Sequence, residues 1–264
     1  YGHTWKKDFR WQTNFTLSHN KNKIIELVKD YIHPETGEPI NKDRLDVGGL
    51  GKARFILKTG GSLGDLYTQA DLKRDDNGMV EISPAGALIT VNNQPDIKLG
   101  SVFPKCNLAW SNQFSWKGFN LSVFIQGSYG NDIFNASRIE TEGMYDGKNQ
   151  STKVLNRWKI PGQITNVPKA NFKLLNSTYF IEDGSYLRLK DVSLSYNFKG
   201  KLLQKWGITR LQPYFTATNL LTWTSYSGMD PEVNQWGNSG TVQGIDWGTY
   251  PHCRSYVFGI NVEF

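Results

Sequence analysis

The sequence lacks long hydrophobic runs. No stretch of eighteen consecutive apolar residues occurs, so we expect no transmembrane helix in it. A membrane-spanning β-strand needs only about ten residues of alternating character, so the absence of such a run leaves strands of that kind open. Cysteine is also scarce: Cys106 and Cys253 have no CxxC partner and no cluster of histidines beside them, so we expect no metal site.

Signatures of nucleotide chemistry and of nucleic-acid binding are missing as well. The chain has no Walker A sequence and no G-x-G-x-x-G, and its four histidines are dispersed. The net charge is +6, from 30 basic and 24 acidic residues, but no block of five or six Lys or Arg occurs. We therefore expect no enzyme, no cofactor and no nucleic-acid partner.

Alternation of apolar and polar residues is the strongest pattern that is present, and the last eleven residues show it best. Successive side chains of a strand point to opposite faces, so this segment predicts one apolar and one polar face. A strand that ends on an aromatic residue is typical of an outer-membrane barrel, although the edge of a soluble sandwich fits this strand alone equally well. The apolar positions of this predicted barrel-assembly strand are Tyr256, Phe258, Ile260, Val262 and Phe264.

The same alternation recurs upstream and predicts about eight antiparallel strands. One begins near Phe9, and two more form a hairpin around the turn Lys117-Gly118. Tyr186–Phe198 and Thr209–Leu221 form a further pair, and we expect the terminal strand to lie beside Thr209–Leu221. The side chains of the first of this pair that we expect to face lipid are Val192, Leu194, Tyr196 and Phe198. Those that we expect to face the lumen are Ser193, Ser195 and Asn197.

The connections between these strands alternate in length. Lys117-Gly118 and Lys199–Ile208 are short, whereas Asn131–Tyr179 and Trp223–Tyr250 are long. Short turns at one rim and long loops at the other are typical of an outer-membrane barrel. The pattern therefore favours an all-β, antiparallel transmembrane barrel segment, with the strand pairing between residues 45 and 90 left open.

Several stretches, in this order, carry a family likeness: Gly130-Asn-Asp-Ile-Phe-Asn, Asn156-Arg-Trp-Lys-Ile-Pro-Gly, Tyr186-Leu-Arg-Leu-Lys-Asp-Val-Ser-Leu-Ser-Tyr, Asn219–Val233, Gly248-Thr-Tyr-Pro and Arg254–Phe264. They resemble the C-terminal part of SusC-like TonB-dependent transporters of the Bacteroides type. The likeness runs from about residue 95 to the end, and the first ninety residues match the family only in general style.

This resemblance implies a barrel of roughly 22 strands, plugged by an N-terminal domain, in the cell outer membrane. Residues 1–264 would be the C-terminal part of that barrel, with the plug domain, the TonB-contacting region and the leading strands absent from this chain. It further implies TonB-dependent import of oligosaccharides, or less often of peptides. The implied partners are TonB, a SusD-like surface lipoprotein, the remaining part of the same barrel, outer-membrane lipid, and a glycan or peptide ligand.

The loop Trp223–Tyr250 is the candidate site for ligand or partner contact. Aromatic rings stack on the C–H faces of sugars, while carboxylates and amides accept hydrogen bonds from hydroxyls. The alternative is that these side chains pack the loop itself. The candidates are Trp223, Tyr226, Asp230, Glu232, Asn234, Trp236, Asp246, Trp247 and Tyr250.

Three other functions stay open at this point: a soluble carbohydrate-binding β-sandwich, a β-rich glycoside hydrolase and a TonB-dependent siderophore receptor. A hydrolase requires two convergent carboxylates, and Asp230 and Glu232 flank a proline that more simply fixes a turn. We also expect Cys106 and Cys253 to remain unpaired, because four ladder steps place them roughly 19 Å apart. The substrate and the oligomeric state are not predicted.

Overall fold

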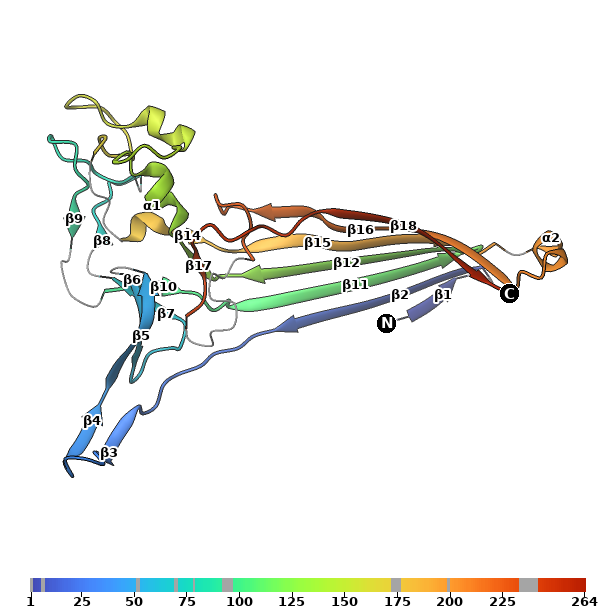
Figure 1. Cartoon of the computed structure of the whole chain (residues 1–264), viewed down its shortest axis with the longest axis horizontal. Helices are drawn as coiled ribbons and strands as arrows, with labels where there is room; N and C mark the ends of the chain where they lie inside the picture. Colours follow the sequence, from blue (N-terminus) through green and yellow to red (C-terminus); the bar gives the residue numbers. More distant parts are fainter. Residues whose placement is uncertain are drawn as a thin grey trace.

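The computed structural model describes residues 2–5, 8–50, 53–68, 71–77, 79–91, 97–171, 177–198, 200–232 and 242–264. They form one long antiparallel sheet with a group of smaller elements at one end (Figure 1). The strands of the long sheet, in spatial order, are β1 (Gly2–Trp5), β2 (Phe9–Ser18), β11 (Cys106–Trp116), β12 (Phe119–Tyr129), β15 (Tyr186–Tyr196), β16 (Arg210–Thr224) and β18 (Ser255–Glu263). The sheet thus has seven described strands where the sequence predicted about eight, because the described residues between 45 and 90 join the smaller elements instead.

One face of the sheet is apolar, and no second layer formed by the described residues covers it. Residues in register continue this face from strand to strand: Leu121 lies opposite Leu194, and Phe215 lies between Leu194 and Phe258. Leu194 is 44% exposed and Phe258 is 79% exposed. In a β-sandwich these side chains would be buried against a second sheet. Their exposure agrees with the predicted lipid-facing side and contradicts the sandwich alternative for this sheet.

The order of the strands confirms the predicted place of the terminal strand. β18 pairs with β16 over nine residue pairs, from Arg210 opposite Glu263 to Thr218 opposite Ser255. Within the described residues, β18 and β1 are the two edges, and β18 makes no pairing with β2. The seven strands therefore form an open sheet and do not close on themselves.

Short and long connections lie at opposite ends of the strands, as predicted. The β11–β12 turn and the β15–β16 connection, which contains α2 (Lys201–Lys205), lie at one end in Figure 1, and all long connections lie at the other. Lys117 and Gly118 both have positive φ, +46° and +97°. That geometry is the type I′ turn, whose twist matches the twist of the strands it joins.

A β-bulge shifts the alternation of β15 by one residue. Leu189 pairs with Ile125 and Asp191 with Phe124, so Lys190 has no partner on β12. The apolar positions are consequently even-numbered after the bulge, as at Leu194, and odd-numbered before it, as at Leu189. Bulges redirect side chains in this way and are frequent beside functional sites.

The long connections fold together into what we call the loop module, which consists of the described residues within 19–105, 130–185 and 225–254. Its strands are β3 (Val28–Ile32), β4 (Pro39–Lys42), β5 (Arg44–Leu50), β6 (Ala53–Lys58), β7 (Asp65–Thr68), β8 (Asp71–Leu72), β9 (Thr90–Val91), β10 (Ile97–Ser101), β13 (Asp132–Asn135), β14 (Ile181–Asp183) and β17 (Ile245–Asp246). Its helices are α1 (Ser137–Glu142), η1 (Thr152–Asn156) and η2 (Thr178–Phe180). Neither these helices nor α2 is long and apolar enough to cross a membrane.

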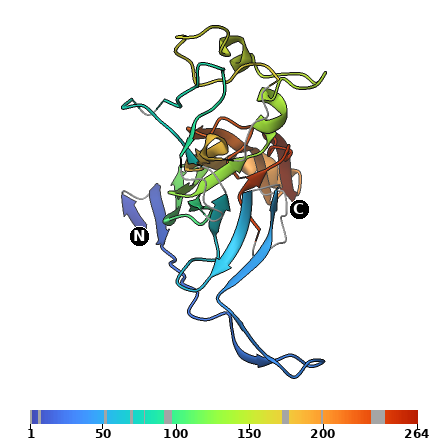
Figure 2. The same cartoon turned by 90° about the vertical axis from the view of Figure 1, so that its left-hand side faces the viewer.

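The loop module has a hydrophobic core of its own. Segments far apart in sequence contribute to it, and Figure 2 shows them gathered at the end of the sheet. Its fully buried side chains include Phe55, Leu66, Phe134, Phe180 and Ile245. The module is therefore a packed body and not a set of independent loops.

Candidate functional site

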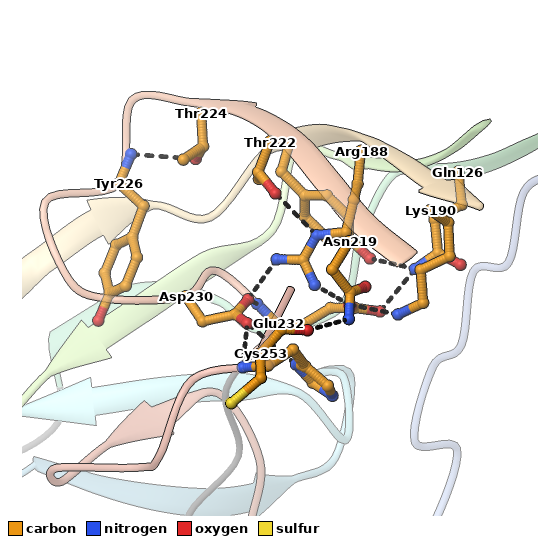
Figure 3. A network of polar contacts seen from close by, with 12 residues as sticks. Gln126, Arg188, Lys190, Asn219, Thr222, Thr224, Tyr226, Asp230, Glu232 and Cys253 are labelled. Atoms are coloured by element: carbon orange, nitrogen blue, oxygen red, sulfur yellow. Dashed lines mark hydrogen bonds and ion pairs between the residues drawn. The ribbon is translucent and has the colours of Figure 1, made fainter. Parts of the chain in front are cut away.

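The main polar site lies where the loop module meets the polar face of the sheet, and Arg188 is at its centre (Figure 3). The side chain is 3% exposed. Its Nη2 donates to Asp230 Oδ1 at 2.5 Å, its Nη1 to Glu232 Oε2 at 2.6 Å, and its Nε to Thr222 Oγ1 at 2.9 Å. One guanidinium on β15 thus holds two carboxylates of the loop that follows β16. Charge-assisted hydrogen bonds of this kind are the stronger ones in proteins.

The bulge in β15 places Arg188 on the polar face. Arg188 lies in register with Gln126 on β12 and Thr222 on β16, so the three side chains form one row across the sheet. Gln126 Nε2 donates to Glu232 Oε1 at 2.7 Å, and Lys190 Nζ lies 3.2 Å from Glu232 Oε2. Gln126 and Lys190 therefore bind Glu232 together with Arg188.

Asp230 is fixed from a second side by the chain just before β18. Its Oδ2 accepts hydrogen bonds from the backbone N–H of His252 at 3.0 Å and from His252 Nδ1 at 2.9 Å. Its Oδ1 accepts from the backbone N–H of Glu232 at 2.9 Å, which is the turn expected around Pro231. Asp230 therefore ties both ends of the loop to β15.

The pKa of Asp230 shows which effect dominates at this site. Burial acts to raise it, but the hydrogen bonds from Arg188, from the Glu232 and His252 backbone and from the His252 ring outweigh burial and hold the pKa at about 2. A general acid for glycoside hydrolysis requires a raised pKa. The arrangement therefore opposes the hydrolase alternative.

Three side chains of this site carry atoms that can bind a metal ion. Asp230, Glu232 and His252 offer ligand atoms within 4.8 Å of one another. Arg188 and Lys190 already bring two positive charges to these carboxylates. A divalent cation would have to displace them, so the arrangement is a salt-bridge network and does not fit a metal centre.

Other candidate residues pack the loop itself. Tyr226 and Asp246 are both buried, and the Tyr226 hydroxyl donates to Asp246 Oδ2 at 2.7 Å. Burial first, and then this carboxylate, raise the pKa of Tyr226 above its ordinary range. Trp247 and Tyr250 are exposed and available for contact. Asn234 and Trp236 lie outside the described residues.

Two aromatic residues lie elsewhere than expected. β16 extends to Thr224, so Trp223 belongs to the strand and not to the loop, and it lies opposite Leu187 on the apolar face. Tyr186 lies in the row of Ser128 and Thr224, on the polar face, whereas the alternation of Val192, Leu194 and Tyr196, continued toward the start of the strand, predicts the apolar face for it. The bulge explains Tyr186, because alternation counted from Tyr196 without a bulge gives it the opposite face.

Sequence reasoning missed Arg188, Lys190 and Gln126 as site residues. One signal was available: Arg188 stands between two leucines at the polar position of a strand. A G-x-S-x-G match, Gly60–Gly64, was also overlooked. Its serine hydroxyl donates to the Asn22 side chain at 2.9 Å and precedes strand β7, whereas the nucleophile motif stands between a strand and a helix.

No protein-family model matches the chain, but individual proteins do. It is 30% identical over 98% of its length to the TonB-dependent receptor P3 of Formosa agariphila, and 29% identical over 97% to the TonB-dependent receptor P26 of that organism. It is 22% identical over 98% to the TonB-dependent receptor SusC of Bacteroides thetaiotaomicron. The chain spans only about a quarter of these relatives, 25–27% of their length.

A solved structure described as the RagAB peptide transporter shares the fold. It superimposes on the whole of this chain with a TM-score of 0.74 at 24% identity, and 28% of its own length is matched. The open sheet with one apolar face agrees with such a partial match. Over nearly its whole length the chain is therefore similar to TonB-dependent receptors, SusC among them, and it shares the fold of the matching part of an outer-membrane β-barrel protein.

Proposed function

We propose that this chain is the C-terminal part of the barrel of a transporter that imports oligosaccharides or peptides across the outer membrane. A plug domain and further strands would complete the barrel, TonB would supply energy, and a SusD-like lipoprotein would cover the loop module. The exposed apolar face of the long sheet carries the proposal, because lipid is the environment that such a face requires.

The polar face would line the lumen of this barrel. Ser193 and Thr216 hydrogen-bond across it at 2.9 Å, and Gln12 and Gln113 lie opposite one another on the same side. Such side chains suit a water-filled wall or contact with a plug. The Arg188 network would then hold the loop after β16 against the top of this wall, so that Trp247 and Tyr250 are presented to a ligand or a partner.

Uptake by cells that carry the full-length receptor tests this function. Labelled oligosaccharides and labelled peptides would be offered to receptor-deleted cells, with and without the receptor restored, and with and without TonB. We expect receptor- and TonB-dependent uptake of one of the two substrate classes. Uptake of an iron–siderophore complex alone would support the siderophore-receptor alternative, and a receptor that stays soluble without detergent would contradict the barrel.

A further inference from the structure

The positive charge of this chain is concentrated in one stretch. Residues 147–181 contain no Asp or Glu but six basic residues: Lys148, Lys153, Arg157, Lys159, Lys169 and Lys173. The net charge of the whole chain is also +6, so the remaining residues balance, with 24 of each sign. The described part of this stretch, residues 147–171, is called the basic segment below.

Three of its cations form no ion pair within the described part of the chain. Lys148 pairs with Glu140 and Asp146, and Lys153 lies 3.6 Å from Glu142. Among the described residues, by contrast, Arg157, Lys159 and Lys169 form no ion pair. Surface charges usually alternate in sign, and a single-sign patch marks a place where an oppositely charged partner is favoured.

Apolar side chains stand among these cations and point to a protein partner. Ile160 is 65% exposed and Ile164 is 86% exposed. Stacking on a sugar requires an open aromatic face, but Trp158 is half-buried and packs against the backbone at Gly86. A polar, charged rim around aliphatic side chains is the composition of protein–protein interfaces.

The basic segment is held in one shape by its own hydrogen bonds. The backbone N–H of Trp158 donates to Val167 O at 2.9 Å, and Thr165 Oγ1 donates to Asn156 O at 2.6 Å. Gln163 Nε2 also donates to Arg157 O at 3.1 Å. A surface that is ordered before binding loses less conformational entropy when a partner arrives.

The position of the segment leaves it accessible. In Figures 1 and 2 it lies beyond α1, at the far side of the loop module from the β3–β4 hairpin. We propose that the basic segment is a docking surface for an acidic face of the SusD-like lipoprotein. The identity of this partner rests on the proposed function. The charge and the exposed aliphatic residues of the segment are features of this chain itself.

Charge reversal in the full-length receptor tests this surface. The receptor carrying Arg157→Glu, Lys159→Glu and Lys169→Glu would be purified together with the SusD-like lipoprotein encoded beside it, and the affinity measured at several salt concentrations. We expect a loss of at least about tenfold at low salt, because three attractions become repulsions, and a weaker salt dependence than in the unaltered receptor. A second variant, Ile160→Asp with Ile164→Asp, should weaken binding at all salt concentrations.

The matched control reverses two exposed cations on the opposite side of the loop module, Lys29→Glu and Lys42→Glu in the β3–β4 hairpin, and should bind within about twofold of the unaltered receptor. If the triple variant bound the lipoprotein as tightly as the unaltered receptor, the basic segment would not be its docking surface, although the partnership itself would not be contradicted. If the unaltered receptor did not retain the lipoprotein, the partnership itself would be contradicted. A triple variant that keeps the lipoprotein but loses binding to lipopolysaccharide vesicles would identify a lipid contact instead.

Discussion

The long sheet and the loop module of this chain bury their apolar residues in opposite ways. Of the buried hydrophobic residues that the structure describes, only Ala217 belongs to the long sheet, and the remainder lie in the loop module. The sheet, in turn, exposes aromatic and aliphatic residues along its whole apolar face. The module is built like a small water-soluble domain, whereas the sheet is built for lipid.

Arg188 joins these two regions. It lies on a strand of the sheet, and it binds the carboxylates of Asp230 and Glu232 in the loop module. The chain therefore combines a loop module that has its own hydrophobic core, a long sheet that has none, and a buried ion-pair network that joins the two. Variants in each part should have distinct effects.

The largest effect is expected in the core of the loop module. Phe134 is 0% exposed and packs edge-on against Phe180, with ring centroids 6.0 Å apart. Phe134→Ala should cost about 3–5 kcal/mol of module stability, through lost burial and an unfilled cavity. Hydrogen exchange of the full-length receptor would measure this as lost protection in the module. Phe258→Ala, on the apolar face of the sheet, should leave the protection of the module unchanged.

Removal of the Arg188 ion pairs should destabilise the loop that follows β16 without unfolding the long sheet. Arg188→Ala leaves Asp230 buried and without its cation, and losing one partner of a buried ion pair typically costs about 3–5 kcal/mol. We expect faster proteolysis after residue 225 and an intact barrel by circular dichroism. Arg188→Lys should lie in between, since one ammonium group cannot replace all the guanidinium bonds. Proteolysis at the unaltered rate would show that the network carries no such role.

A charge on the apolar face should be costly, and a charge on the polar face should be tolerated. Leu194→Arg is expected to cost about 2–4 kcal/mol if the site is near the bilayer midplane. Ser193→Arg, one residue away on the other face, is the matched control. Urea unfolding of the receptor in lipid vesicles would compare the two. Equal costs would mean that the two faces meet similar environments.

Low pH should lower the stability of the loop that follows β16 through the protonation of Asp230. The pKa of Asp230 is about 2 in the folded chain, below the value of about 3.9 for an unfolded aspartate. Its ionised form therefore stabilises the folded loop above about pH 4, and this contribution is lost as the pH falls toward 2. Proteolysis of the loop by an acid-active protease should accelerate in that window. Asp230→Asn should show a raised, pH-independent rate there.

The sequence predicted the sheet well because its pattern is local. Alternation around Lys117-Gly118 and in the last eleven residues is visible without knowledge of any distant contact. The loop module was not predicted, since Phe55, Phe134 and Ile245 meet only in the folded chain. The partners of Arg188 escaped notice for the same reason, as they lie 42 and 44 residues further along.

The β15 bulge marks the limit of pattern reading within the sheet. A single extra residue, Lys190, reversed the face that alternation assigned to Tyr186. Cys106 and Cys253 are both free thiols, as expected. Cys106 begins β11 and Cys253 precedes β18, and three strands, β12, β15 and β16, lie between β11 and β18. The order of the strands was thus predicted more reliably than the face of the sheet to which residues before the β-bulge point.

Cysteine labelling along β15 tests the central claim, that one face of the sheet meets lipid and the other meets water. Single cysteines at Val192, Ser193, Leu194 and Ser195 would be placed in a receptor whose native cysteines are replaced by serine. A water-soluble maleimide should label positions 193 and 195 and leave 192 and 194 unlabelled until detergent is added. Beyond the bulge, cysteine at Leu187 or Leu189 should be protected as well. Equal labelling at all positions, or labelling in the opposite phase, would contradict the account.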